Sequence, residues 1–189
     1  MTEKEIESLP SVTEILGKTI APREELIRWI REVEKRGQSS LAVMQKAARR
    51  GTKIHKLSSL LSTKQKTEIP KVYQERLQTL QTYLSQKKNL QTEILCWKEG
   101  EVSYKGHIDY LYEDERGLVL ADLKTGNRLQ KTHELQLFGY KDAIEFSKNI
   151  SINILELLHL TSERLKVVEI PYKAEVWNSV LELYKYLYM

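Results

Sequence analysis

Residues 106–126 read GHIDYLYEDERGLVLADLKTG, two apolar-rich runs joined by a charged turn that ends in glycine. Short apolar runs bounded by turn residues are typical of β-strands. We therefore expect strands at 103–112 and 117–123. A third strand is expected at 93–97, because Glu99-Gly100 provides a further turn. Consecutive strands with such short connections predict a three-stranded antiparallel meander.

Alternation along the strands predicts how the polar residues of this stretch are arranged. Asp122 and Lys124 are two residues apart, so on a strand they share one face, and Ala121 and Leu123 share the other. A hairpin of this length is expected to bring Asp109 alongside Asp122. Two carboxylates and an amine would then share one pocket on adjacent strands.

This arrangement favours metal-assisted chemistry. Two close carboxylates repel each other, and a divalent cation removes that repulsion; oxygen ligands suit Mg²⁺ or Mn²⁺. Lys124 is a poor ligand while protonated, but it can orient a water molecule and stabilise a developing negative charge. Taken alone, however, an Asp-x-Lys pair is more often an ordinary surface salt bridge at a strand edge.

The rest of the chain alternates helical and strand patterns. The first half is mostly helical: a helix should begin near Pro22 and end at Gly37, a second should span about 41–61, and a third should begin at Pro70. After the meander we expect a helix at 132–146 capped by Thr132, strands at 152–160 and 165–170, and a final helix at about 174–187. This order predicts an α/β fold with a mixed central sheet and flanking helices.

Length and composition favour one globular domain. The 189 residues suit a single domain, which we divide into a helical part, 1–88, and a sheet core with flanking helices, 89–189. Apolar residues make up 41% and charged residues 30%, as in soluble proteins. The net charge of +4 permits a phosphate-rich partner without requiring one.

The cysteine count and the length of the apolar runs indicate the cellular compartment in which the protein is expected. Cys96 is the only cysteine, so the chain cannot form an internal disulfide, and a reducing compartment fits. No apolar run approaches the length of a membrane span, and residues 1–9 lack the basic start and apolar stretch of a signal peptide. We expect a cytoplasmic protein, or one in the host cytoplasm if the source is a virus, with no membrane partner.

Several motifs in this order resemble the PD-(D/E)XK nuclease superfamily, and most closely its RecB-type and viral exonucleases, which include the mitochondrial genome maintenance exonuclease. The resemblance extends from about Leu9 to Tyr140 and implies a restriction-endonuclease-like core. The motifs are Gly106-His107-Ile108-Asp109, Asp122-Leu123-Lys124-Thr125, Gln136-Leu137-Phe138-Gly139-Tyr140, Gly51-Thr52-Lys53-Ile54-His55 and the opening segment Pro10-Ser11-Val12-Thr13-Glu14-Ile15-Leu16.

The resemblance implies a metal site. Asp109, Asp122 and the backbone carbonyl of Leu123 would be ligands, and Lys124 would position or activate the water. His55 would be a further ligand from a helix; it shares a helical face with the small residue Gly51, which allows close packing. Glu93 would help to bind a second metal or its water shell, although it could equally be an exposed strand carboxylate.

The resemblance also gives roles to polar residues around this site. Gln136 and Tyr140 are four apart on the predicted helix, hence on one face. They would orient the lysine or contact substrate phosphates; the alternative is a polar residue and an aromatic at the core boundary. Thr125 would donate to a phosphate or cap the turn.

Basic residues near these motifs are candidates for DNA binding. Arg49, Arg50, Lys53 and Arg128 would bind phosphates without reading sequence. Such a charge run is also typical of a solvated helix face. Trp29, Trp97 and Tyr104 could stack on bases, but we expect them in or near the core.

We therefore expect an Mg²⁺- or Mn²⁺-dependent deoxyribonuclease, an exonuclease acting on single- or double-stranded DNA ends. The alternatives are a structure-selective endonuclease or junction resolvase of the same superfamily, and a non-catalytic DNA-binding subunit with a nuclease-like fold. One cysteine cannot hold the four-cysteine iron–sulfur cluster of the CRISPR-adaptation nucleases, and the chain lacks a P-loop for ATP. A homo-oligomer, a replication or recombination partner, and a viral or mobile-element source all fit.

Overall fold

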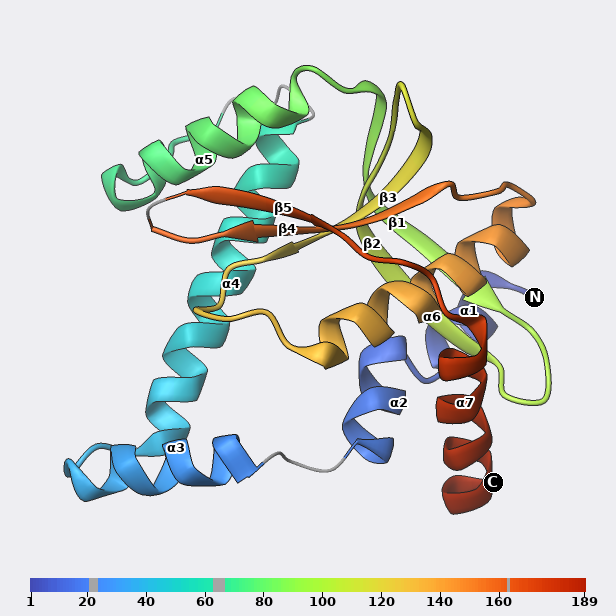
Figure 1. Ribbon diagram of the computed structural model, residues 1–189, viewed down its shortest axis with the longest axis horizontal. Coiled ribbons are helices and arrows are strands. Elements are labelled where there is room, and N and C mark those ends of the chain that lie inside the picture. The colour runs from blue at the N-terminus through green and yellow to red at the C-terminus, as the bar shows by residue number, and fades with distance from the viewer. Residues whose placement is uncertain (21–23, 63–66, 163) are drawn as a thin grey trace.

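A computed structural model describes residues 1–20, 24–62, 67–162 and 164–189. Helices and strands follow one another as in Figure 1, with five helices before the meander, one helix between the third and fourth strands, and one at the end. The elements are α1 (Glu3–Ser8), α2 (Val12–Thr19), α3 (Glu24–Lys35), α4 (Ser40–Ser62), α5 (Lys71–Leu84), β1 (Lys88–Lys98), β2 (Tyr104–Asp114), β3 (Gly117–Lys124), α6 (Lys131–Lys148), β4 (Ile154–Leu160), β5 (Leu165–Glu169) and α7 (Ala174–Tyr188).

The five strands form one mixed sheet in the order β1-β2-β3-β4-β5. All neighbouring pairs are antiparallel except β3 and β4, which are parallel and connected through α6. A parallel pair needs a crossover connection of this kind, because the chain must return to the starting end of the sheet. The expected meander and the expected mixed sheet with flanking helices are confirmed.

Helices cover both faces of the sheet. On one face α2, α6 and α7 bury a cluster that includes Leu120 and Trp177. On the other face α4 and α5 bury a second cluster that includes Ala121 and Leu123. Successive residues of β3 therefore supply the two cores in turn, and both faces of this strand are fully buried, as its nearly uniform apolar sequence predicts.

The N-terminal segment differs from the expectation in detail. It forms two short helices that the sequence analysis did not predict, and each begins at a hydroxyl cap. The Thr2 side chain accepts from the Glu5 N–H, and the Ser11 side chain accepts from the Glu14 N–H at 3.1 Å. Val12 then packs so closely on α6 that a methyl group added at Gly139 would lie 2.9 Å from it. The Pro-Ser-Val-Thr-Glu-Ile-Leu motif thus packs against the helical layer that covers the sheet.

Other boundaries shift by a few residues. β1 begins at Lys88, five residues before the expected strand, and α6 begins at Lys131 with Gln130 as its N-cap, so the predicted cap at Thr132 is wrong. Pro22, the expected start of the first long helix, lies outside the described residues. Within the described parts of the chain, no helix combines the length and apolar character needed to cross a membrane.

Candidate active site

The site forms where strands β2 and β3 separate. Their pairing runs from the turn at Asp114–Gly117 to Tyr110–Ala121 and stops there. The next residue on each strand is a carboxylate, Asp109 on β2 and Asp122 on β3. Residues opposite one another on antiparallel strands present side chains on the same face, so the hairpin brings these two carboxylates together.

The Asp109 side chain on strand β2 contacts helix α4. Its Oδ1 lies 3.0 Å from His55 Nδ1, and its Oδ2 accepts a hydrogen bond of 2.7 Å from the backbone N–H of Leu123. Burial lowers the pKa of His55, but the hydrogen bond and the charge of Asp109 outweigh it, so the pKa of His55 lies above its usual value. His55 is therefore held towards its charged form as the partner of Asp109.

Asp122 is a buried carboxylate whose partners are incomplete. It is 3% exposed, and Lys124 Nζ lies 2.7 Å from its Oδ2. That contact is a close ion pair, yet its angles do not make a hydrogen bond, and Oδ2 has no hydrogen-bond partner among the described residues. Burial raises the pKa of Asp122 above its usual value; Lys124 opposes the rise and the nearby charge of Asp109 adds to it.

A chain of hydrogen bonds from helix α6 holds Lys124. Lys124 Nζ donates to Gln136 Oε1 at 2.7 Å, and Gln136 Nε2 donates to the Tyr140 hydroxyl at 2.5 Å. The Tyr140 ring in turn lies against Gly106 on β2, where an added methyl group would be 2.6 Å from it. The glycine of the Gly-x-x-Asp motif thus leaves the space that the tyrosine ring of the Gln-x-x-x-Tyr motif occupies.

Glu93 lies beside this group on the neighbouring strand. Its flanking residues Thr92 and Ile94 pair with Tyr110 and Ile108, so Glu93 is level with Asp109 across the β1–β2 ladder. Its φ of 54° marks an irregularity in β1 at this point. Partial burial and the nearby charge of Asp109 raise the pKa of Glu93 above its usual value.

The loop after β3 lies beside helix α4 at the edge of the site. A methyl group added at Gly51 would lie 3.3 Å from Thr125 Oγ1, so the small residue lets α4 approach this loop. His159 on β4 is level with Lys124, and its Nε2 lies 2.7 Å from the Gly126 carbonyl oxygen. Because a carbonyl oxygen only accepts, that nitrogen must carry the proton. The sequence analysis missed His159, since only the β3–β4 register reveals it.

The basic candidates do not all face this site. Residues two apart on an α-helix do not share a face, so Lys53 leaves α4 on a different side from His55. Lys53, Arg49 and Arg50 instead line a groove along α4. Arg128 is exposed on the loop before α6.

The three aromatic candidates lie in different surroundings. Tyr104 is fully buried, and its hydroxyl accepts from the Trp177 indole N–H at 2.9 Å. Trp97 is a residue of β1, and the Lys148 ammonium lies over its ring. Trp29 borders the groove along α4, together with Tyr73 and Asn127, two residues that the sequence analysis did not select. Tyr73 lies on α5, and nothing in the sequence places Asn127 beside α4.

Comparison with known proteins agrees with this geometry. A family model described as the PD-(D/E)XK nuclease superfamily matches residues 12–184. The chain therefore belongs to the PD-(D/E)XK nuclease superfamily. No curated protein matches it. A solved structure described as the crystal structure of SSO0001 is similar over 98% of this chain and 81% of that chain, with 17% identity and a TM-score of 0.51, a likeness that shows the fold alone.

Proposed function

We propose that this chain is a metal-dependent nuclease that hydrolyses phosphodiester bonds in DNA, and that it acts from ends as an exonuclease. The observation that carries the proposal is the meeting of Asp109, Asp122 and Lys124 where β2 and β3 separate. A surface salt bridge, the simplest alternative for Asp122 and Lys124, does not account for a carboxylate that is 3% exposed.

The donor set fits a divalent cation, although it is not yet arranged as a coordination shell. Among the described residues, no three His, Cys, Asp or Glu side chains form a group ready to hold a metal ion. The buried Asp122 Oδ2 supports the fit, because Lys124 balances its charge but it accepts no hydrogen bond from a described residue, which leaves it able to accept a cation as a partner. We propose that Asp109, Asp122, the Leu123 carbonyl and His55 hold Mg²⁺ or Mn²⁺, with Glu93 beside them.

When bound, the cation supplies Lewis-acid activation and neutralises charge at the scissile phosphate. The chain's own residues provide the remaining functions. Lys124 offers a positioned ammonium that orients the attacking water and stabilises negative charge as it develops. Gln136 keeps that ammonium in place, and Tyr140 fixes the orientation of the Gln136 amide. Thr125, which lies beside Gly51 on the adjoining loop, is proposed to donate to a substrate phosphate.

The test is digestion of end-labelled single- and double-stranded DNA with Mg²⁺, with Mn²⁺ or with EDTA. The proposal requires nucleotide release that depends on the metal. Binding of DNA without release under any of these conditions would favour the alternative of a non-catalytic DNA-binding subunit. A parallel digestion of RNA determines whether the activity is confined to DNA.

Circular single-stranded DNA separates the exonuclease from the endonuclease. A strict exonuclease leaves the circle intact and degrades the same molecule once it has been linearised. Conversion of the circle to linear fragments would favour a structure-selective endonuclease or junction resolvase instead.

A further inference from the structure

Helix α4 has an unusual charge composition. Along its 23 residues it carries five cations and no acidic residue. The chain contains 26 Asp and Glu among 189 residues, so a segment of this length with average composition would contain about three. His55, the only α4 residue placed at the proposed metal site, does not explain these cations, which are Lys46, Arg49, Arg50, Lys53 and Lys56.

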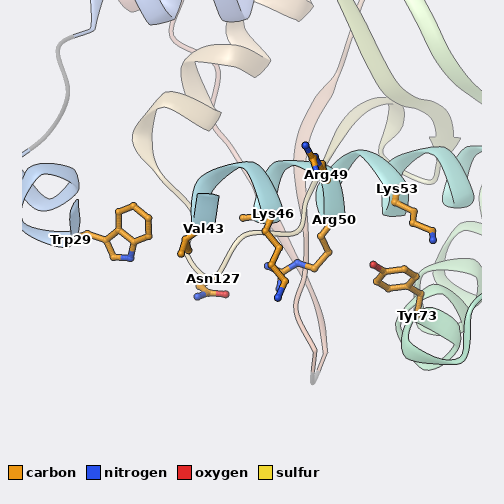
Figure 2. Close-up of a pocket in the computed structure, with 9 residues that line it drawn as sticks. Trp29, Val43, Lys46, Arg49, Arg50, Lys53, Tyr73 and Asn127 are labelled. Atoms are coloured by element: carbon orange, nitrogen blue, oxygen red, sulfur yellow. The ribbon is translucent and has the colours of Figure 1, made fainter. Parts of the chain in front are cut away.

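Four of these cations, Lys46, Arg49, Arg50 and Lys53, line a groove. Figure 2 shows Lys46, Arg50 and Lys53 pointing to the same side of α4, towards Tyr73 and Asn127, while the Arg49 side chain is turned away from that side. The cavity has a volume of about 550 Å³ and is bounded by α3, α4, α5 and the loop before α6. We call it the α4 groove and define it by Trp29, Lys46, Arg50, Lys53, Tyr73 and Asn127.

The α4 groove and the proposed catalytic carboxylates lie on different sides of helix α4, and the loop after β3 extends from one to the other. Lys46, Arg50 and Lys53 follow one another at intervals of four and three, so they form a stripe along one side of α4. Gly51 and His55 form another stripe, which meets Thr125 and Asp109. Asn127 borders the groove only three residues after Lys124. The groove therefore reaches the loop that follows the catalytic strand.

The charges in the groove are not neutralised by the protein. Among the side chains that the structure describes, no Asp or Glu lines it, and none of its four cations has an ion pair within 4.0 Å. All four are exposed on α4. Unpaired cations on one side of a helix favour a polyanionic ligand.

Two aromatic rings distinguish this groove from a general anion surface. Trp29 and Tyr73 are half-buried and lie on α3 and α5; Figure 2 shows Trp29 near the Lys46 end and Tyr73 near the Lys53 end of the cationic stripe. The Lys53 ammonium lies 5.8 Å from the centre of the Tyr73 ring. Cations that follow a backbone beside rings that accept bases are the usual means of binding unpaired nucleic acid strands. In a duplex the base faces are stacked and unavailable to such rings.

We propose that the α4 groove binds a single-stranded segment of nucleic acid next to the bond that is cut. Lys46 and Lys53 are seven residues apart, about 10 Å along the helix, a length that corresponds to about three phosphates of a stacked strand. Lys46, Arg50 and Lys53 contact those phosphates, while Trp29 and Tyr73 stack on bases. This assignment rests on the proposed nuclease function and names its substrate as an unpaired strand.

The test measures binding without cleavage. The full chain is titrated in EDTA with fluorescent oligo-dT and oligo-U of about twelve nucleotides, and anisotropy is recorded between about 50 and 200 mM salt. Replacing Lys46, Arg50 and Lys53 together with Gln should weaken binding at least tenfold and reduce the slope of log affinity against log salt by about 2, since each phosphate contact contributes about 0.7 on a single strand.

Matched variants separate the groove from overall charge and from general stacking. The triple variant Lys4→Gln, Lys88→Gln and Lys173→Gln removes the same charge from exposed positions outside the groove and should leave the slope unchanged. Trp29→Phe should abolish quenching of tryptophan fluorescence by the oligonucleotide, while Trp97→Phe should retain it. Trp29→Ala should weaken binding about tenfold, and a duplex of equal length should bind less tightly than either single strand.

Three results would overturn the proposal: equal salt slopes for the two triple variants, unchanged binding by Trp29→Ala, or displacement of the oligonucleotide by poly-glutamate at equal charge concentration. Binding by oligo-dT, by oligo-U or by both supports it, because the phosphates and base faces are shared. The outcome is independent of cleavage. If the protein binds through the groove but releases no nucleotides, only the proposed nuclease function is contradicted. If it cleaves but its binding does not depend on the groove residues, only the proposal for the groove is contradicted.

Discussion

The Lys124 ammonium and the Gln136 amide oxygen are 2.7 Å apart, although they belong to different elements, a strand end and a helix interior. Gln136 is buried and also donates to Tyr140, so its amide has little freedom to turn. A lysine has many rotamers, and this contact selects the one that lies beside Asp122. Gln136 is thus a positioning residue for Lys124.

Replacing Gln136 with Ala should lower kcat roughly 10- to 100-fold with little change in KM, as is typical for partners that orient a catalytic group. The measurement is steady-state release of nucleotides. Tyr140→Phe removes only the hydroxyl that orients the amide and should have a smaller effect of the same kind. A rise in KM with unchanged kcat would show that Gln136 binds substrate instead.

Replacing Lys124 with Ala should reduce cleavage about 10²- to 10³-fold, the usual effect of losing one group that stabilises the transition state. Oligonucleotide affinity in EDTA should stay within about twofold, because Lys124 points at Asp122 and Gln136 and not into the α4 groove. Circular dichroism melting checks that the variant folds. Normal turnover would remove Lys124 from the mechanism.

Replacing Asp109 with Asn should weaken Mn²⁺ binding as well as activity, because a neutral amide is a poorer ligand for a divalent cation. The substitution keeps the size of the side chain, and its Oδ1 can still accept from the Leu123 N–H, whereas its Nδ2 can donate to His55 Nδ1 only when that ring is neutral. Isothermal titration calorimetry measures the affinity. Asp114→Asn is the control, since Asp114 pairs with Arg116 away from the site, and it should bind Mn²⁺ as the wild type does.

Replacing Gly106 with Ala should destabilise the protein by about 1–3 kcal/mol, the usual cost of overpacking, because the new methyl group would lie 2.6 Å from the Tyr140 ring. Chemical denaturation gives the free energy of unfolding. Gly100→Ala is the matched control, because nothing lies within 4 Å of its added methyl group. If both variants unfold at the same denaturant concentration, Tyr140 is not held against β2 as described.

Without metal, Asp122 and His55 should contribute less to the stability of the protein as the pH rises from about 4 to above 7. The pKa values of Asp122 and His55 are both raised above their usual values of 3.8 and 6.5. For each group, the folded state therefore binds its proton more tightly than the unfolded state, so the stability it contributes at low pH is lost as the pH passes its raised pKa.

The pH dependence can be checked by denaturation in EDTA at pH 5 and pH 8. Asp122→Asn should reduce the loss between the two pH values, because the amide has no proton to release and carries no charge when buried. Mn²⁺ should have the opposite pH dependence and stabilise more at pH 8, since protons compete with it for the same side chains. An Asp122→Asn variant with the wild-type pH dependence would contradict this assignment.

The sequence predicted those parts of the structure that depend on local pattern. Strand periodicity placed Asp122 and Lys124 on one face, and the short β2–β3 turn placed Asp109 opposite Asp122, because register in a hairpin follows from its turn. Helix periodicity likewise placed Gln136 with Tyr140. The same local pattern misplaced the start of α6, where Gln130 caps the helix and Thr132 does not.

Features that depend on tertiary packing were not predictable. Arg50 and Lys53 were grouped with His55 because they are neighbours in sequence, but the turn of α4 directs them into a separate groove whose other walls come from α3 and α5. The contact of His159 with the Gly126 carbonyl depends on the parallel register of β3 and β4. No pattern within either segment specifies that register.

The separation of β2 from β3 beyond Tyr110–Ala121 has a consequence for the sheet itself. It creates an edge inside the molecule, where backbone groups are released from the ladder and become available to side chains, as the Leu123 N–H is to Asp109. An outer edge with free backbone groups invites pairing with another chain. Here the Asp109 carboxylate accepts from the Leu123 N–H and His55 on α4 pairs with that carboxylate, so side chains of the protein itself occupy the place where a foreign strand would pair.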